Sequence, residues 1–402
     1  SSTSIPLEMT REVVSMDTVV TLVLLSLSCV TATKSHKFGP AITEFSTNVF
    51  RELNREHGEE NLAISPTNIF RALLLTYFGS GGNTTAALER VLELKMSYSE
   101  VAAEYDVWRN GTVEGVREAD RIYFNSNLSL EERIVSFLGD ELSQLDFTQN
   151  TSVGVINDWV ENKTEGEIKH FIDRIDQNTE MLVITASHLQ AMWQEEFNVN
   201  KTYDFSFFLS NGSVISVLMM NKLQYFQYHN STVLMSEILT IPYTTEGLSF
   251  VILLPFNDGY TTVETVIHLL SYENMKELKR GSQKELNLYL PKFKVEQKVE
   301  MKKLLLALGL SEIFSPGIAN FTGFTSESEI YVSDVFQKVS MEIDEKGTKA
   351  AAASVVVFTF LSFAPIPSFR VNRPFIYMVY DDVAEVPLFL GTMMQPEIYS
   401  EE

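Results

Sequence analysis

The sequence predicts a single large α+β domain, and three observations support this prediction. Amphipathic helical patterns dominate the first third of the chain, whereas strand-like apolar runs bounded by turn residues dominate the part after residue 180. No linker rich in Pro, Gly or Ser divides the chain after residue 38, and no internal repeat is visible. Helices that mostly come first and strands that mostly come later are typical of α+β domains built on large sheets.

The predicted helices begin with the amphipathic segment 44–58. Ser65 and Pro66 open the next apolar segment, with the serine placed as an N-cap, and Gly79 ends it. Three further helices are predicted at 84–94, 130–142 and 153–162.

The predicted strands are runs rich in β-branched and aromatic residues between turn residues. They cover residues 181–189, 231–243, 248–256, 285–293, 329–343, 375–381 and 386–394.

The chain is strongly acidic, with a net charge of -22. Contacts to nucleic-acid phosphates need clustered Lys and Arg, so a nucleic-acid partner is not expected. The nearest basic cluster, at 276–303, is interleaved with glutamates and indicates a solvated face with salt bridges.

The apolar run at 19–32 has the length of a signal peptide and is too short to span a bilayer comfortably. The small residues Val30 and Ala32 place the predicted cleavage after Ala32, so 1–32 is an N-terminal extension with a signal peptide. Acidic Glu12 and Asp17 stand where a basic flank is expected. The alternative is therefore an uncleaved segment that attaches the protein to the cell surface.

Two further features favour a secreted, extracellular glycoprotein. The only cysteine, Cys29, lies in the predicted signal, so the mature chain would contain no disulfide. Asn-x-Ser/Thr sequons are more frequent than the roughly four expected by chance. They are the candidate glycosylation sites Asn83, Asn110, Asn127, Asn150, Asn162, Asn200, Asn211, Asn230 and Asn320.

Motifs that would indicate an enzyme are missing from the sequence. There is no HExxH, CxxC, Walker loop, GxGxxG or GxSxG, and the six histidines are scattered. The glycines of 79–83 are explained by a helix end followed by a turn. We therefore predict neither catalysis nor a cofactor or metal ion.

The segment 345–363 fits no ordinary helix or strand. It starts with Glu345, continues through Gly347 and Thr348, and ends in β-branched and aromatic residues. Between them lie four alanines, Ala350, Ala351, Ala352 and Ala353. Glycine supplies a flexible pivot, and small uncharged side chains can enter a packed sheet. Such a segment is a strand without a partner and, if exposed, an aggregation hazard.

Several ordered blocks of sequence, together with this segment, resemble the serpins, a family of serine-protease inhibitors. The blocks include NLAISPTNI (61–69), LYLPKFKVE, LLLALGLSEIF, PLFLGTMMQP and, most specifically, the hinge-like EIDEKGTKAAAAS. The resemblance covers about 38–396. It implies a serpin domain at 38–402, with helices packed on a large central β-sheet, two further sheets and an exposed reactive-centre loop at about 345–369.

The resemblance implies a monomeric suicide substrate rather than an enzyme. The target protease cleaves the loop and stays covalently attached as an acyl-enzyme while the loop enters the central sheet. Family spacing places the reactive bond fourteen residues beyond Gly347, at Leu361-Ser362. The distal part of the loop is a residue or two longer than in familiar members, so the register is open by that amount.

The loop sequence constrains the target protease. No Lys or Arg lies between Lys349 and Arg370, so the carboxylate in a trypsin-like specificity pocket finds no partner. Leu361 suits a hydrophobic pocket. Chymotrypsin-like enzymes such as cathepsin G are therefore expected, with elastases next.

The resemblance also assigns positions that control opening of the central sheet. They are the polar cluster Asn68, Thr185 and Gln337, and Trp193 at the top of the sheet. The helices around 84–110 carry no basic stripe, so activation by heparin is not expected. The alternative function is a non-inhibitory serpin that carries a ligand or acts as a surface glycoprotein. A bulky or charged residue at Thr348 or Ala350 would favour that alternative, and neither is present.

Overall fold

The computed structural model describes residues 37–397 apart from 112, 327–328 and 348–364. The predicted signal peptide and most of the predicted reactive-centre loop lie outside the described residues. Within the described ranges, no helix combines the length and the apolar character needed to cross a bilayer.

A five-stranded sheet carries the predicted sheet-opening positions. Its strand order is β10 (Phe293–Glu300), β11 (Val332–Ile343), β4 (Met181–Leu189), β2 (Val116–Asn125) and β3 (Leu142–Leu145). The neighbours β11 and β4 are parallel, as are β2 and β3, whereas the other two pairs are antiparallel. We call the row of backbone pairing between β4 and β11 the seam.

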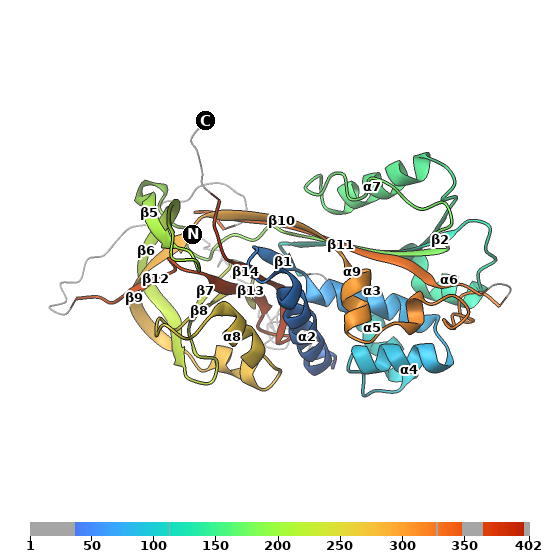
Figure 1. Ribbon diagram of the computed structural model, residues 1–402, viewed down its shortest axis with the longest axis horizontal. Coiled ribbons are helices and arrows are strands. Elements are labelled where there is room, and N and C mark those ends of the chain that lie inside the picture. The colour runs from blue at the N-terminus through green and yellow to red at the C-terminus, as the bar shows by residue number, and fades with distance from the viewer. Residues whose placement is uncertain (1–36, 112, 327–328, 348–364, 398–402) are drawn as a thin grey trace, which may run out of the picture. The chain divides into compact units, whose positions relative to one another are not determined.

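Both faces of this sheet are covered. Helix α7 (Thr151–Lys163) lies on one face and α3 (Pro66–Phe78) on the other, with α5 (Tyr98–Arg109) beside α3 (Figure 1). All nine residues of β4 are buried as a result. This explains why its sequence is almost continuously apolar rather than alternating.

The second sheet has nine strands. They are β1 (Leu62–Ile64), β14 (Val386–Met393), β13 (Phe375–Asp381), β8 (Leu248–Pro255), β7 (Ser236–Pro242), β6 (Val214–Ser231), β9 (Ser282–Pro291) and β12 (Ser368–Arg370) in spatial order, with β5 (Thr202–Phe208) paired to β6. The eighteen-residue β6 is long enough to pair with β5 over its first half and with β7 at its end. It therefore joins the two further sheets expected from the resemblance into one.

The remaining helices enclose the core. They are α2 (Gly39–His57), α4 (Gly82–Val91), α6 (Glu132–Leu138), α8 (Val263–Leu269) and α9 (Met301–Ala307). The apolar face of α2 packs on α3 and β14, and the rings of Phe45 and Phe70 meet edge to face at 5.7 Å. Burial of such aromatic residues supplies much of the packing energy in a core without disulfides.

The α+β fold is confirmed, with differences in detail. The predicted helix at 130–142 is shorter, because α6 ends at Leu138 and a 3₁₀ turn leads into β3. Strand β2 falls in the part of the chain that we predicted to be helical. Ser65 occupies the N-cap position of α3, but its hydroxyl donates to the Leu388 carbonyl at 2.8 Å instead of capping the helix.

Candidate functional site

The predicted hinge begins with a tight turn at the end of β11. The backbones of Asp344 and Gly347 exchange two hydrogen bonds, with N···O distances of 3.1 and 3.3 Å. The Asp344 carboxylate accepts from the backbone N–H groups of Lys346 at 2.8 Å and Gly347 at 3.1 Å. The chain therefore reverses direction as it leaves the sheet.

This turn is docked on the residues that follow β4. The backbone N–H of Trp193 donates to the Lys346 carbonyl at 3.1 Å, and its indole Nε1–H donates to the Asp344 carbonyl at 2.9 Å. Met192 and Gly347 form an antiparallel bridge. The turn thus ties the C-terminal end of β11 to the C-terminal end of β4, directly above the seam.

Trp193 is buried in an aromatic cluster. Its ring stacks on Tyr243 with a centroid distance of 4.6 Å and an angle of 7°, and Phe250 meets it edge-on at 5.7 Å. The side chain is fixed by these rings and by the indole hydrogen bond to Asp344. It therefore positions the turn rather than presenting a reactive group.

Only glycine fits at position 347. Its φ of +117° lies in a region that residues with a side chain rarely adopt. A Cβ atom there would approach the Ala191 carbonyl oxygen to 2.4 Å and the Trp193 backbone nitrogen to 2.6 Å. The pivot predicted from the sequence is therefore a closely packed turn.

We expect Gly347→Ala to lower the melting temperature of the intact protein by roughly 5–10 °C. Backbone strain of about 1–3 kcal/mol is joined by a collision with backbone atoms that cannot rotate away. Gly212→Ala is a matched control, because φ is +83° there and no atom lies within 4 Å of the added Cβ. Scanning calorimetry that shows equal losses for both variants would contradict the close contact at Gly347.

Glu345 anchors the same turn. Its side chain is almost fully buried, its Oε2 lies 3.0 Å from Lys292 Nζ, and its carbonyl accepts from the Phe197 N–H at 2.7 Å. Burial favours the neutral acid, but Thr202 and Lys292 outweigh this effect and the pKa of Glu345 lies below its ordinary value. The carboxylate is therefore ionised and paired at neutral pH.

The seam has a geometry that could accept one more strand. Strands β4 and β11 run parallel, in continuous register from Leu182 opposite Asp334 to His188 opposite Ser340. A segment that follows the turn at 344–347 and lies between them runs antiparallel to both. It would replace one parallel pairing by two antiparallel ones, which are slightly more stable per residue.

The predicted polar cluster lies under this seam. Gln337 on β11 is the register partner of Thr185 on β4, and both are fully buried. The Gln337 amide bonds both backbone groups of Ser65, accepting from N at 3.1 Å and donating to O at 2.8 Å. Asn68 lies three residues further along, on α3, so the structure brings these predicted positions beneath one sheet.

The amide of Asn68 is buried beneath the seam. The residue is fully buried, and neither Oδ1 nor Nδ2 has a hydrogen-bond partner among the residues that the structure describes. An unsatisfied buried amide costs about 1–3 kcal/mol. Asn68 therefore places an amide without a described protein partner below the strands that would have to separate.

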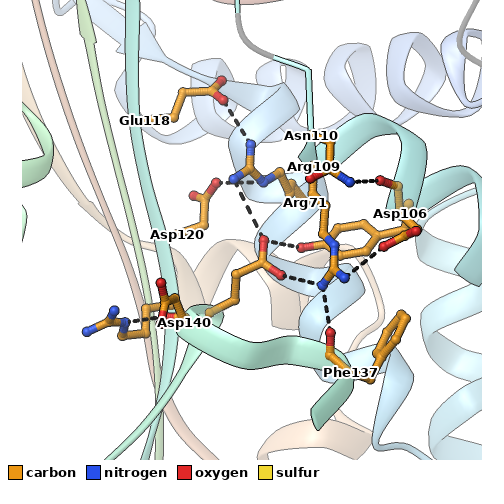
Figure 2. Close-up of polar contacts among 11 residues, drawn as sticks. Arg71, Asp106, Arg109, Asn110, Glu118, Asp120, Phe137 and Asp140 are labelled. Atoms are coloured by element: carbon orange, nitrogen blue, oxygen red, sulfur yellow. Dashed lines mark hydrogen bonds and ion pairs between the residues drawn. The ribbon is translucent and has the colours of Figure 1, made fainter. Parts of the chain in front are cut away.

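An ion-pair network that was not predicted from the sequence lies next to this cluster (Figure 2). Arg71 on α3 lies 3.1 Å from Asp120 and 3.0 Å from Glu118, both on β2, and 3.8 Å from Glu141. A signal was available, since Arg71 is the one charge in the apolar run IFRALLL. Its partners lie 47 to 70 residues away and could not be identified without the sheet register.

The other predicted site residues are distributed as follows. Eight of the nine sequon asparagines are exposed, and Asn320 is half-buried. Thr348, Ala350, Ala351, Ala352, Ala353, Leu361 and Ser362 lie outside the described residues, so their roles stay predictions.

Comparison with known families agrees with this architecture. Residues 40–396 match the model of the family described as serpin (serine protease inhibitor). The chain belongs to the serpin family. The expectation drawn from the ordered sequence blocks and the hinge is thereby confirmed.

Individual relatives and structures support the same assignment. Serine protease inhibitor 88Ea of Drosophila melanogaster is 30% identical over 385 residues, covering 88% of this chain and 89% of the relative. Leukocyte elastase inhibitor of Equus caballus is 28% identical over 375 residues, covering 89% of this chain and 98% of the relative. Among solved structures, the thermophilic serpin tengpin in its native state matches with a TM-score of 0.80 and 26% identity, covering 89% of this chain and 94% of tengpin.

Proposed function

We propose that this serpin is an extracellular inhibitor of chymotrypsin-like serine proteases that acts as a suicide substrate. The observation that supports it most is the connection of the hinge turn at 344–347 to the seam. The chain reverses direction in this turn, and the residues that follow it in the sequence are small and uncharged at most positions.

The reaction proposed at the loop is the first half of proteolysis. The serine oxygen of the protease attacks the carbonyl carbon of Leu361, the bond to Ser362 breaks, and the new amine takes the proton through the protease histidine. The ester between Leu361 and the protease serine would then be carried along as 348–361 enters the seam. Fourteen residues reach about 46 Å as a strand at roughly 3.3 Å per residue.

Two features of the chain support the finer parts of the proposal. The exposed sequon asparagines would be accessible to glycan attachment, as expected for a secreted protein. The names of the relatives include serine protease inhibitors and leukocyte elastase inhibitors, in agreement with a target that accepts an uncharged residue. Chymotrypsin and cathepsin G are preferred over elastases because Leu361 and the phenylalanines near it are large.

The proposal is tested by mixing the purified protein with active-site-titrated proteases. Chymotrypsin or cathepsin G should be lost stoichiometrically into a complex that survives denaturing electrophoresis, whereas trypsin should be barely affected. Leu361→Arg should reverse this preference, because the arginine supplies the cation that the trypsin pocket binds. Ser362→Ala changes the neighbouring residue without adding charge and is the control.

Two outcomes would contradict the proposal. Faster inactivation of trypsin than of chymotrypsin by the natural chain would overturn the register and the specificity. Cleavage without any covalent complex would favour a non-inhibitory carrier. The solved human thyroxine-binding globulin in complex with its ligand has the same fold, with a TM-score of 0.81 at 23% identity.

A further inference from the structure

Helix α3 bridges the seam on its buried side. Ser65, the residue immediately before α3, is held by Gln337 of β11, on one side of the seam. Six residues later, Arg71 contacts β2 on the other side, where its Nε lies 3.1 Å from Asp120 Oδ2 and its Nη1 donates to Glu118 Oε2 at 3.0 Å. Six residues rise about 9 Å along an α-helix, and two strand spacings from β11 through β4 to β2 measure about 9.6 Å.

The attachments follow a single row across the sheet. Gln337 is the register partner of Thr185, and Thr185 is the register partner of Asp120. Asp120, Thr185 and Gln337 thus lie side by side on three adjacent strands, and all three are buried. The rise of this stretch of α3 therefore matches the distance from β11 to β2 in the closed sheet.

The Arg71 end of the bridge is electrostatically strong. The Asp120 carboxylate is fully buried and the Arg71 side chain is 14% exposed, so solvent screens their attraction only weakly. Every carboxylate that Arg71 contacts in the described chain lies on β2 or on the 3₁₀ turn before β3. Glu141 is itself held by the Tyr105 hydroxyl at 2.7 Å and lies 3.6 Å from Arg109.

Insertion of a strand into the seam would change the distance that α3 spans. Strand β4 would move away from β11 by about 4.8 Å, and β2 and β3 would move with β4 because they are hydrogen-bonded in series. A helix cannot stretch by this amount. One of its two attachments must therefore break or slide before the sheet can open.

We propose that the ion pair between Arg71 and Asp120 holds the seam closed through α3 and thereby sets the rate of loop insertion. This inference rests on the insertion mechanism proposed above. Arg71 is a positioning residue here, since it acts on the loop only through the spacing of the strands. The helix is attached to β11 by two hydrogen bonds of Gln337, and to β2 by a buried charge pair.

The pair also makes insertion depend on pH. Burial raises the pKa of Asp120 to about 7, although Arg71 opposes the shift, and Glu118 and Glu141 add to it. The charged or titratable groups that face Asp120 are Arg71 of α3, Glu118 of β2, Glu141 of the 3₁₀ turn and Tyr105 of α5. Protonation of Asp120 below about pH 7 removes the attraction to Arg71, so insertion should accelerate as the pH falls.

The experiment follows insertion without a protease. The intact protein is incubated with a synthetic peptide of residues 348–361, and the formation of a heat-resistant complex is timed between pH 6 and 8.5. At pH 8.5 we expect Asp120→Asn to anneal the peptide about tenfold faster than the natural chain, equivalent to about 1.4 kcal/mol of barrier. The natural chain should accelerate towards pH 6, whereas the variant should not.

Two further variants separate this role from simple destabilisation. Glu277→Gln is the matched control, because Glu277 is also a buried carboxylate. It pairs with Arg280 and His229, and none of these three residues belongs to β4, β11, β2 or α3. It should leave the annealing rate unchanged. Glu118→Gln removes a partner of Arg71 whose side chain is 26% exposed, and it should give a smaller acceleration in a protein that folds readily.

The annealing rates test the role of the ion pair without requiring that the protein inhibit a protease. Annealing by Asp120→Asn and Glu118→Gln at the rate of the natural chain would overturn the inference, as would equal acceleration by Glu277→Gln. The inference would also be overturned if Asp120→Asn lowered the melting temperature equally in the intact and the loop-cleaved protein. That result would indicate that the pair only stabilises the fold. Failure of the proposed function would appear separately, as absence of a covalent protease complex.

Discussion

Cleavage of the loop within residues 355–363 by a protease that is not the target should raise the melting temperature by about 10–30 °C. The turn at 344–347 keeps the cut segment attached to β11 above the seam, so it needs only to fold back between β4 and β11. Once there, it would gain a neighbouring strand on each side. Scanning calorimetry of the intact and the clipped protein, side by side, measures the difference.

The expected size follows from the number of residues that become ordered. Roughly one hydrogen bond per residue at about 1 kcal/mol, together with burial of Val356, Phe358 and the inward-facing alanines, should exceed the ordering cost by ~10 kcal/mol. A clip in the exposed segment 257–260, between β8 and α8, is the control and should give no increase. If the two clipped forms melted alike, the loop could not be inserting, and the non-inhibitory alternative would be preferred.

Thr348→Arg should convert the inhibitor into a substrate. Residue 348 directly follows Gly347, which is fixed against Met192, so it would be the first residue to enter the seam. An arginine there would have to bury an unpaired guanidinium, which slows insertion and gives the acyl-enzyme time to hydrolyse. Denaturing electrophoresis with chymotrypsin should show cleaved serpin in place of most of the covalent complex.

The chain supplies a control at the next position. Side chains alternate between the two faces of a strand, so Lys349 would point away from the face that Thr348 enters. Lys349→Arg keeps the charge and should leave the yield of complex unchanged. Undiminished complex formation by Thr348→Arg would show that the segment does not insert as proposed.

Local patterns were sufficient to predict much of the fold. Burial on both faces makes β4, β8 and β14 continuously apolar, and each was predicted close to its observed bounds. Strand β2 was missed because Arg117, Glu118, Asp120 and Arg121 interrupt its apolar residues. Their partners come from distant segments, namely Arg71 of α3 for Glu118 and Asp120, the Asp140 carbonyl for Arg121, and Glu165 for Arg117. Such long-range partners are not visible in a local pattern.

The site was predictable in its composition but not in its connections. Asn68, Thr185 and Gln337 were predicted as a group from the family resemblance, and the register places two of them opposite each other. The bonds from Gln337 to the backbone of Ser65 depend on how α3 approaches the sheet. The packing that leaves the Asn68 amide without a partner likewise exists only in three dimensions.

The buried amide of Asn68 has a consequence for anyone who engineers this protein. A stabilisation campaign would choose this position early, since an apolar residue there removes an unsatisfied group. Such a variant would tolerate heat better, yet the intact form would have less free energy to release when the loop enters the sheet. Libraries screened for heat resistance alone would therefore become enriched in weak inhibitors, and thermal tolerance should be selected only together with trapping of the protease.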